Sequence, residues 1–140
     1  MKFVTSFHHA RKWWYYENSY TPDKRYDTED PRYGDLYSQP HEKGAPPTKE
    51  YMENWEAKIV EVIDKYEPDL LWFDGGIGRK DYFRSAFDDF QEYKKRFLAY
   101  YYNRAEEWSR EVGVTYKHQD LPAGAGILDL ERGRLDSLSN

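Results

Sequence analysis

Cysteine is absent from the 140 residues of this chain, and its absence excludes disulfide bonds and thiolate metal sites. Long hydrophobic runs are also missing: no stretch approaches the ~20 apolar residues that a membrane-spanning helix requires, and no signal peptide is visible. Neither charge dominates, because 21 lysines and arginines stand against 26 aspartates and glutamates. The net charge of −5 indicates no nucleic-acid partner, and the length allows at most one ordinary domain.

Aromatic residues, in contrast, are abundant at 19% of the chain, and 14 of them are tyrosines. Tyrosine and tryptophan present a flat apolar face with a polar edge, which suits sugar-binding clefts as well as cores. The opening stretch FVTSFHHARKWWYY, Phe3–Tyr16, places two tryptophans and two tyrosines shortly after two adjacent histidines. This stretch could form a metal site, a sugar-binding wall or a crowded part of the core.

The order of apolar runs and amphipathic segments predicts a parallel α/β fold. Short apolar runs of strand length alternate with segments whose apolar residues recur at the three- and four-residue steps of a helix. Residues 10–47, which are polar and rich in turn formers, are predicted as a long loop. Strands that are apolar along their length belong to sheets covered on both faces. The predicted strands are Phe3–Phe7, Asp69–Asp74, Val114–Lys117 and Ile127–Glu131, and the predicted helices are Thr48–Tyr66 and about Ser85–Glu111.

A polar side chain follows or closes each predicted strand. The pair His8 and His9 follows the first strand, and Asp74, Lys117 and Glu131 end the other three. Each has an ordinary explanation on its own. Asp74 could form a turn, Lys117 could be solvated and Glu131 could be a salt-bridged strand end. The two histidines could be one core and one surface imidazole. In parallel α/β sheets and barrels, however, catalytic residues gather at the carboxyl ends of the strands. The joint pattern therefore predicts a catalytic site at this edge of the sheet.

Two carboxylates on separate strand ends, flanked by aromatic residues, match the chemistry of glycoside hydrolysis. In retaining enzymes one carboxylate attacks the anomeric carbon and the other protonates the leaving oxygen. A separation of about 5–5.5 Å between the two carboxylates gives retention of configuration, and a wider separation gives inversion. The alternative is a metal-dependent hydrolase that uses His8, His9 and Asp74 as ligands. Adjacent histidines lack the helical spacing that places two rings on one face, so no metal or other cofactor is predicted.

The segment KYEPDLLWFDGG, Lys65–Gly76, resembles the nucleophile segment of the α-L-fucosidases of glycoside hydrolase family 29. The family signature runs from a tyrosine through Pro-Asp and a few apolar residues to Trp-Phe-Asp-Gly. The resemblance implies that Asp74 is the nucleophile. The segment YKHQDLPAGAGILDLERG, Tyr116–Gly133, is similar to the stretch that follows in one bacterial branch of the family, which implies Glu131 as the general acid/base.

The same resemblance implies a retaining exo-glycosidase that acts on terminal α-L-fucosides. Its predicted partner is a fucosylated glycan or glycoside, with no nucleic acid and no membrane. Members of the family are often periplasmic, secreted or lysosomal, and the sequence sets neither the compartment nor the oligomeric state. The residues that the resemblance and their positions assign to substrate binding are His8, His9, Trp13, Trp14, Trp72 and Lys117.

The resemblance implies a (β/α)8 barrel, and the number of strands in this chain predicts that the barrel is incomplete. A complete barrel takes ~250 residues, whereas this chain supplies about four strands, the third to the sixth if Asp74 ends the fourth. We therefore expect residues 1–140 to be part of a catalytic domain. A non-catalytic half-barrel, which binds sugar or complements a missing half, is the alternative.

Overall fold

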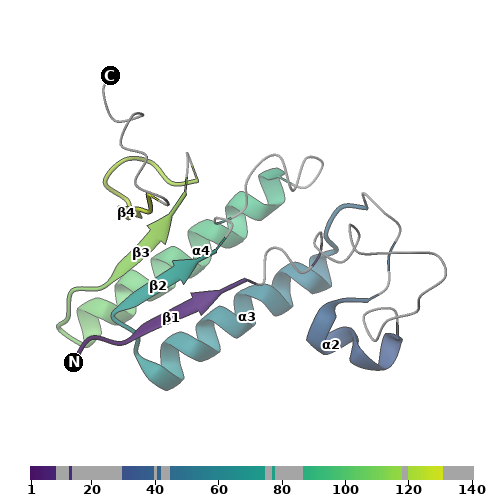
Figure 1. Ribbon diagram of the computed structural model, residues 1–140, viewed down its shortest axis with the longest axis horizontal. Helices are drawn as coiled ribbons and strands as arrows, with labels where there is room; N and C mark the ends of the chain where they lie inside the picture. Colours follow the sequence, from purple (N-terminus) through teal and green to yellow (C-terminus); the bar gives the residue numbers. More distant parts are fainter. Residues whose placement is uncertain are drawn as a thin grey trace.

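The computed structural model describes residues 1–8, 13, 30–39, 41, 45–74, 77, 87–117 and 120–130. These residues form one parallel sheet, two long helices and a short helical segment (Figure 1). In chain order the elements are β1 (Val4–Phe7), the 3-10 helix η2 (Pro31–Tyr33), α2 (Gly34–Tyr37), α3 (Lys49–Tyr66), β2 (Leu70–Phe73), α4 (Phe87–Glu107), β3 (Gly113–Tyr116) and β4 (Ile127–Leu128).

The four strands lie in their sequence order, β1-β2-β3-β4, and each neighbouring pair is parallel. Helices α3 and α4 lie side by side on one face of this sheet (Figure 1), where Tyr100 of α4 donates a hydrogen bond of 2.6 Å to Asp64 of α3. Strands that follow one another without a reversal, with their helices on one face, are the arrangement of a (β/α) barrel wall. A doubly wound sheet instead reverses its strand order and carries helices on both faces. The architecture is therefore compatible with part of a barrel.

Helix α3 begins and ends where the sequence places its capping residues. The Thr48 side chain accepts a hydrogen bond of 3.1 Å from the N–H of Tyr51, which satisfies one of the free donors of the first turn. The helix ends at Tyr66, its C-cap Glu67 has a left-handed backbone with φ 43°, and Pro68 follows. Between these ends, residues at helical spacing turn one side of α3 toward the sheet; those buried are Tyr51, Met52, Trp55, Ile59 and Ile63.

The core lies between the helices and one face of the sheet and is largely aromatic. Leu71 and Phe73 of β2, two residues apart, are both buried on this face. The Phe73 ring centroid lies 5.4 Å from that of Phe97 in α4 and 6.4 Å from that of Trp55 in α3. Phe7 of β1 stacks on Phe73 at 5.2 Å. Aromatic residues thus join both helices to the sheet, which accounts for part of their abundance.

The opposite face of the sheet is more open over the described residues. Val4 of β1 is half exposed, Leu70 of β2 is partly buried, and Ile127 of β4 is more than half exposed. These three side chains belong to one face by register: Val4 pairs with Leu70, and a Cβ on Gly113 would touch the side chains of both Leu70 and Ile127. The expectation of a sheet covered on both faces is therefore wrong for this part of the chain, in which α3 and α4 cover one face.

The predicted parallel strands and the two long helices are confirmed, with shifted ends. The last strand is shorter than expected, because β4 comprises only Ile127–Leu128. The predicted loop 10–47 contains a helical segment, Pro31–Tyr37. That segment begins where Asp30 caps the N–H of Arg32 and Pro31 fixes a helical φ. In the described part of the chain, neither long helix is apolar enough over its length to cross a membrane.

Candidate active site

The alternation of side chains along the strands brings the predicted polar residues to one face. Successive side chains of a strand point to opposite faces, so residues two apart share a face. By this rule His8 lies on the same face as Ser6, and Asp74 lies on the same face as Trp72. Ser6 and Trp72 are partners in the β1–β2 register, so these residues share one face. Lys117 likewise lies on the same face as Thr115 of β3. Because the strands are parallel, these residues meet at the carboxyl edge of the open face, away from the helices.

Asp74 lies at the centre of this group, directly after β2. Its backbone N–H donates to the carbonyl of Phe7 at 3.0 Å, which fixes the chain at the end of the strand. Its carboxylate Oδ1 accepts a hydrogen bond of 2.9 Å from Lys117 Nζ, and its Oδ2 lies 3.0 Å from His8 Nδ1. The side chain remains 24% exposed. Asp74 is thus an oriented carboxylate that a substrate can reach.

Lys117 supplies the positive charge of the site and is not a solvated lysine. Its side chain is only 10% exposed. Its ammonium lies 2.9 Å from Asp74 Oδ1, 3.8 Å from Asp129 Oδ2 and 5.1 Å from the centroid of the Trp72 ring. An ammonium with so little access to water needs anionic partners, and these two carboxylates provide them.

Asp129 is a member of this group that sequence reasoning missed. It follows β4, and its N–H donates to the carbonyl of Tyr116 at 2.8 Å, so it continues the pairing of β3 with β4. Its Oδ2 accepts a hydrogen bond of 2.7 Å from the indole N–H of Trp72. The alternation of side chains along a strand could have identified it in the sequence. Asp129 lies two residues after Ile127 and therefore points to the same face.

The other predicted site residues lie elsewhere or outside the described residues. Trp13 is only 3% exposed; its ring stacks on His41 at 3.8 Å and its N–H donates to the carbonyl of Ala45 at 2.7 Å. Trp13 is therefore packed in the core, and its role in substrate binding stays a prediction. Those outside the described residues are His9, Trp14 and Glu131.

A buried network ties together the chain segments that follow β2 and β3. The carboxylate of Asp120 accepts a hydrogen bond of 2.9 Å from the N–H of Ile77, three residues after Asp74. Lys94 of α4 donates a hydrogen bond of 2.5 Å to the carbonyl oxygen of Asp120. Burial lowers the pKa of Lys94, and the charge of Asp120 opposes that shift. Helix α4 thus holds both segments that carry the polar residues of the site.

No set of three or more histidine, aspartate or glutamate side chains among the described residues is arranged to hold a metal ion. His8 and Asp74, two of the ligands in the metal alternative, instead face each other at hydrogen-bonding distance.

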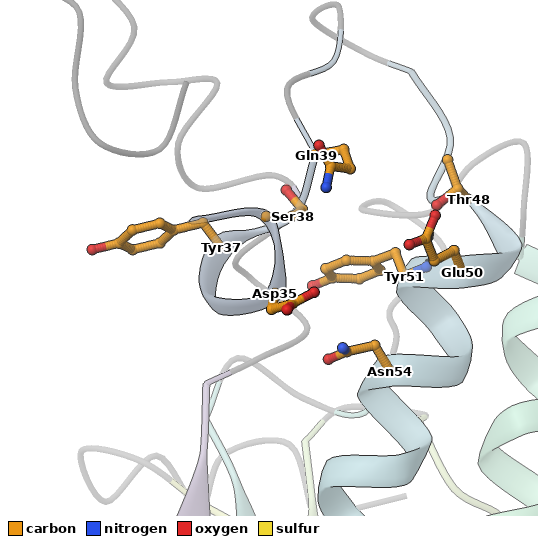
Figure 2. A pocket seen from close by; sticks show the side chains of 9 residues that line it. Asp35, Tyr37, Ser38, Gln39, Thr48, Glu50, Tyr51 and Asn54 are labelled. Carbon is orange, nitrogen blue, oxygen red and sulfur yellow. Dashed lines mark hydrogen bonds between the residues drawn. The ribbon is translucent and has the colours of Figure 1, made fainter. Parts of the chain in front are cut away.

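A small hollow lies between α2 and the first turns of α3. Figure 2 shows its polar lining, which includes Asp35, Gln39 and Glu50. Its cavity volume is about 30 Å³, close to the space that one water molecule occupies. It is too small for a sugar and contains none of the residues at the carboxyl edge of the sheet, so it is a separate feature.

The fold and the site together define the class of protein: a parallel α/β domain whose polar groups gather at the carboxyl ends of its strands, as in α/β-barrel enzymes. A family model described as Alpha-L-fucosidase matches residues 1–137, nearly the whole chain. The chain therefore belongs to the α-L-fucosidase family, and the resemblance seen in Lys65–Gly76 is confirmed. At the level of this family, it is a glycoside hydrolase with a fucosylated glycoside as its class of substrate. No curated protein matches the chain.

Proposed function

We propose that this chain forms the central part of the catalytic domain of a retaining exo-α-L-fucosidase, with Asp74 as the nucleophile. The observation that supports this most directly is the contact of Lys117 and His8 with the two oxygens of the Asp74 carboxylate at the carboxyl edge of the sheet. A neighbouring positive charge favours an ionised carboxylate. Ionised Asp74 is the form that can attack a sugar.

The proposed reaction has two steps, each with one proton transfer. In the first step, Asp74 attacks the anomeric carbon of the fucoside, and the bond to the leaving oxygen breaks as Glu131 donates a proton to that oxygen. The product is a fucosyl ester on Asp74. In the second step, Glu131 takes a proton from water, the water oxygen bonds to the anomeric carbon, and Asp74 leaves as a carboxylate.

The remaining residues bind the substrate in this proposal. Trp72 has an aromatic face close to the nucleophile, and such a face suits the apolar side of a sugar ring. The centroid of its ring lies 6.3 Å from the centroid of the His8 ring. His8 is 63% exposed and can contact a sugar hydroxyl. His9 and Trp14 keep the substrate-binding role that their positions in the sequence predict, whereas Trp13 is only 3% exposed.

Replacement of the nucleophile tests this function. In the gene product that contains these residues, Asp74→Gly should reduce hydrolysis of an aryl α-L-fucoside at least ~10³-fold, because the covalent step loses its nucleophile. Azide should restore part of the turnover and yield the β-fucosyl azide, since the anion attacks from the side of the missing carboxylate. Glu106→Gln, an exposed change on α4, is the control. Unchanged turnover in Asp74→Gly would contradict the proposal.

The second candidate function is a half-barrel that binds sugar without hydrolysing it. The observation in its favour is the open face of the four-stranded sheet, where Val4 and Ile127 are exposed over the described residues. The aryl fucoside assay on the 140-residue chain separates the two functions, because clear turnover by this chain excludes the second.

A further inference from the structure

The carboxylate of Asp129 contacts two of the proposed site residues at once. Its Oδ2 accepts the indole N–H of Trp72 at 2.7 Å and lies 3.8 Å from the ammonium of Lys117. Its side chain is 21% exposed, and its backbone is fixed to β3 through the carbonyl of Tyr116. Asp129 is therefore held in place by the sheet and aimed at the same edge as Asp74.

The chemistry of its two neighbours restricts what Asp129 can do. An indole N–H and an ammonium are donors with no acceptor atom. The indole donates a hydrogen bond to Asp129, and the ammonium is its ion-pair neighbour at 3.8 Å. A proton donor to the leaving group would have to carry a proton toward the sugar. Asp129 instead serves groups of the protein, which separates its role from the one proposed for Glu131.

We infer that Asp129 is a positioning residue of the active site, which fixes the plane of the Trp72 indole and shares the ammonium of Lys117 with Asp74. This inference rests on the proposed function and adds a residue to it. Trp72 has one polar atom, and a bond at that atom sets the direction in which its ring faces the substrate. Lys117 lies between two carboxylates, so its charge is divided between them.

The sharing of Lys117 has a consequence for the nucleophile. Without Asp129, the nearly buried ammonium loses the carboxylate at 3.8 Å and keeps Asp74 at 2.9 Å. A stronger pairing stabilises the ground state of Asp74, which must release its interaction as the bond to the sugar forms. Loss of Asp129 should therefore lower kcat more than it changes KM.

Two substitutions separate the hydrogen bond from the charge. Asp129→Asn keeps an oxygen that can accept from Trp72 but removes the negative charge beside Lys117. Asp129→Ala removes both. We expect kcat for an aryl α-L-fucoside to fall about tenfold in Asp129→Asn and about 100-fold in Asp129→Ala, with retention of configuration in both. Melting curves of both variants establish that they are folded.

A double-mutant comparison tests the route through Trp72. In a Trp72→Phe background, the loss caused by Asp129→Ala should shrink at least about threefold, because the indole that it positions is gone. The inference would be overturned if the losses of kcat caused by Asp129→Ala and Trp72→Phe were fully additive in the double mutant. It would also be overturned if the Asp129 variants kept the kcat and KM of the parent.

A measurement independent of activity completes the test. The indole N–H resonance of Trp72 in ¹⁵N-labelled protein, assigned by its disappearance in Trp72→Phe, should move to higher field in Asp129→Ala and stay closer to its original position in Asp129→Asn. An unmoved resonance would overturn the inference. A parent protein without fucosidase activity, in which this resonance nevertheless moves, would contradict the proposed function but support the contact by which Asp129 positions Trp72.

Discussion

Asp69, the residue before β2, binds the two residues before β1 through its carboxylate. Its Oδ2 accepts the N–H of Phe3 at 2.8 Å, and its Oδ1 accepts from Lys2 Nζ at 3.0 Å. These hydrogen bonds, that of Phe3 first, lower the pKa of the Asp69 carboxyl below its usual 3.8. Because folding lowers this pKa, the ionised carboxyl stabilises the folded state at pH values above the pKa of the same group in the unfolded chain. This stabilisation is lost as the pH falls through the lower, folded value.

Asp69→Asn should therefore lower the melting temperature at about pH 7 and have a smaller effect at about pH 2, because the native carboxyl takes up protons as the pH falls toward its lowered pKa. Circular dichroism melts at both pH values measure this difference. Glu106→Gln, which replaces an exposed acid on α4, is the control and should change the melting temperature little at either pH. A difference between Asp69→Asn and the parent that is equal at both pH values would contradict the account of this residue.

Among the elements, α4 has two neighbouring lysines with opposite surroundings. Lys94 is buried and donates to the carbonyl of Asp120, whose side chain in turn accepts from Ile77. Lys95 is largely exposed and lies 3.8 Å from Glu92. Removal of a donor from a buried carbonyl is costly, whereas an exposed ion pair contributes little. The two lysines are therefore a matched pair for testing how α4 supports the segments after β2 and β3.

Lys94→Met should lower the free energy of unfolding by about 1–3 kcal/mol, because the carbonyl of Asp120 loses its donor. Lys95→Met should lower it by less than about 1 kcal/mol. Urea unfolding of both variants, followed by tryptophan fluorescence, gives the two values. Equal losses would show that the buried contact does not stabilise these segments.

The elements also show how far the sequence determines this fold. The helical spacing in α3, with Thr48 before it and Pro68 after it, predicted a helix that the structure confirms. Sequence reasoning missed the short helix α2, because a polar stretch with few apolar residues gives no helical period. The position of Asp74 after an apolar strand was predictable, but the contact of Asp129 with Trp72 depends on register and on a hydrogen bond between residues 57 apart. No local pattern carries that information.

At the scale of the whole molecule, two physical rules explain why the candidate site exists. Parallel strands in sequential order bring their carboxyl ends to one edge, and the two-residue alternation selects the face. Both rules act on residues far apart in the sequence, so His8, Asp74, Lys117 and Asp129 meet without a common motif. The helices cover the other face, and the polar side chains therefore lie where a substrate has access.

The central claim is that Asp74 forms a covalent bond to the sugar. A 2-deoxy-2-fluoro-α-L-fucosyl fluoride tests this directly, because the fluorine at carbon 2 destabilises the charged transition states and its reactive leaving group still permits the first step. The gene product that contains these residues is incubated with the reagent, digested with a protease and analysed by mass spectrometry. The account predicts a fluorofucosyl adduct on the peptide that contains Asp74 and loss of activity in proportion to labelling. Inactivation with the adduct on another carboxylate, such as Asp129 or Glu131, would contradict it.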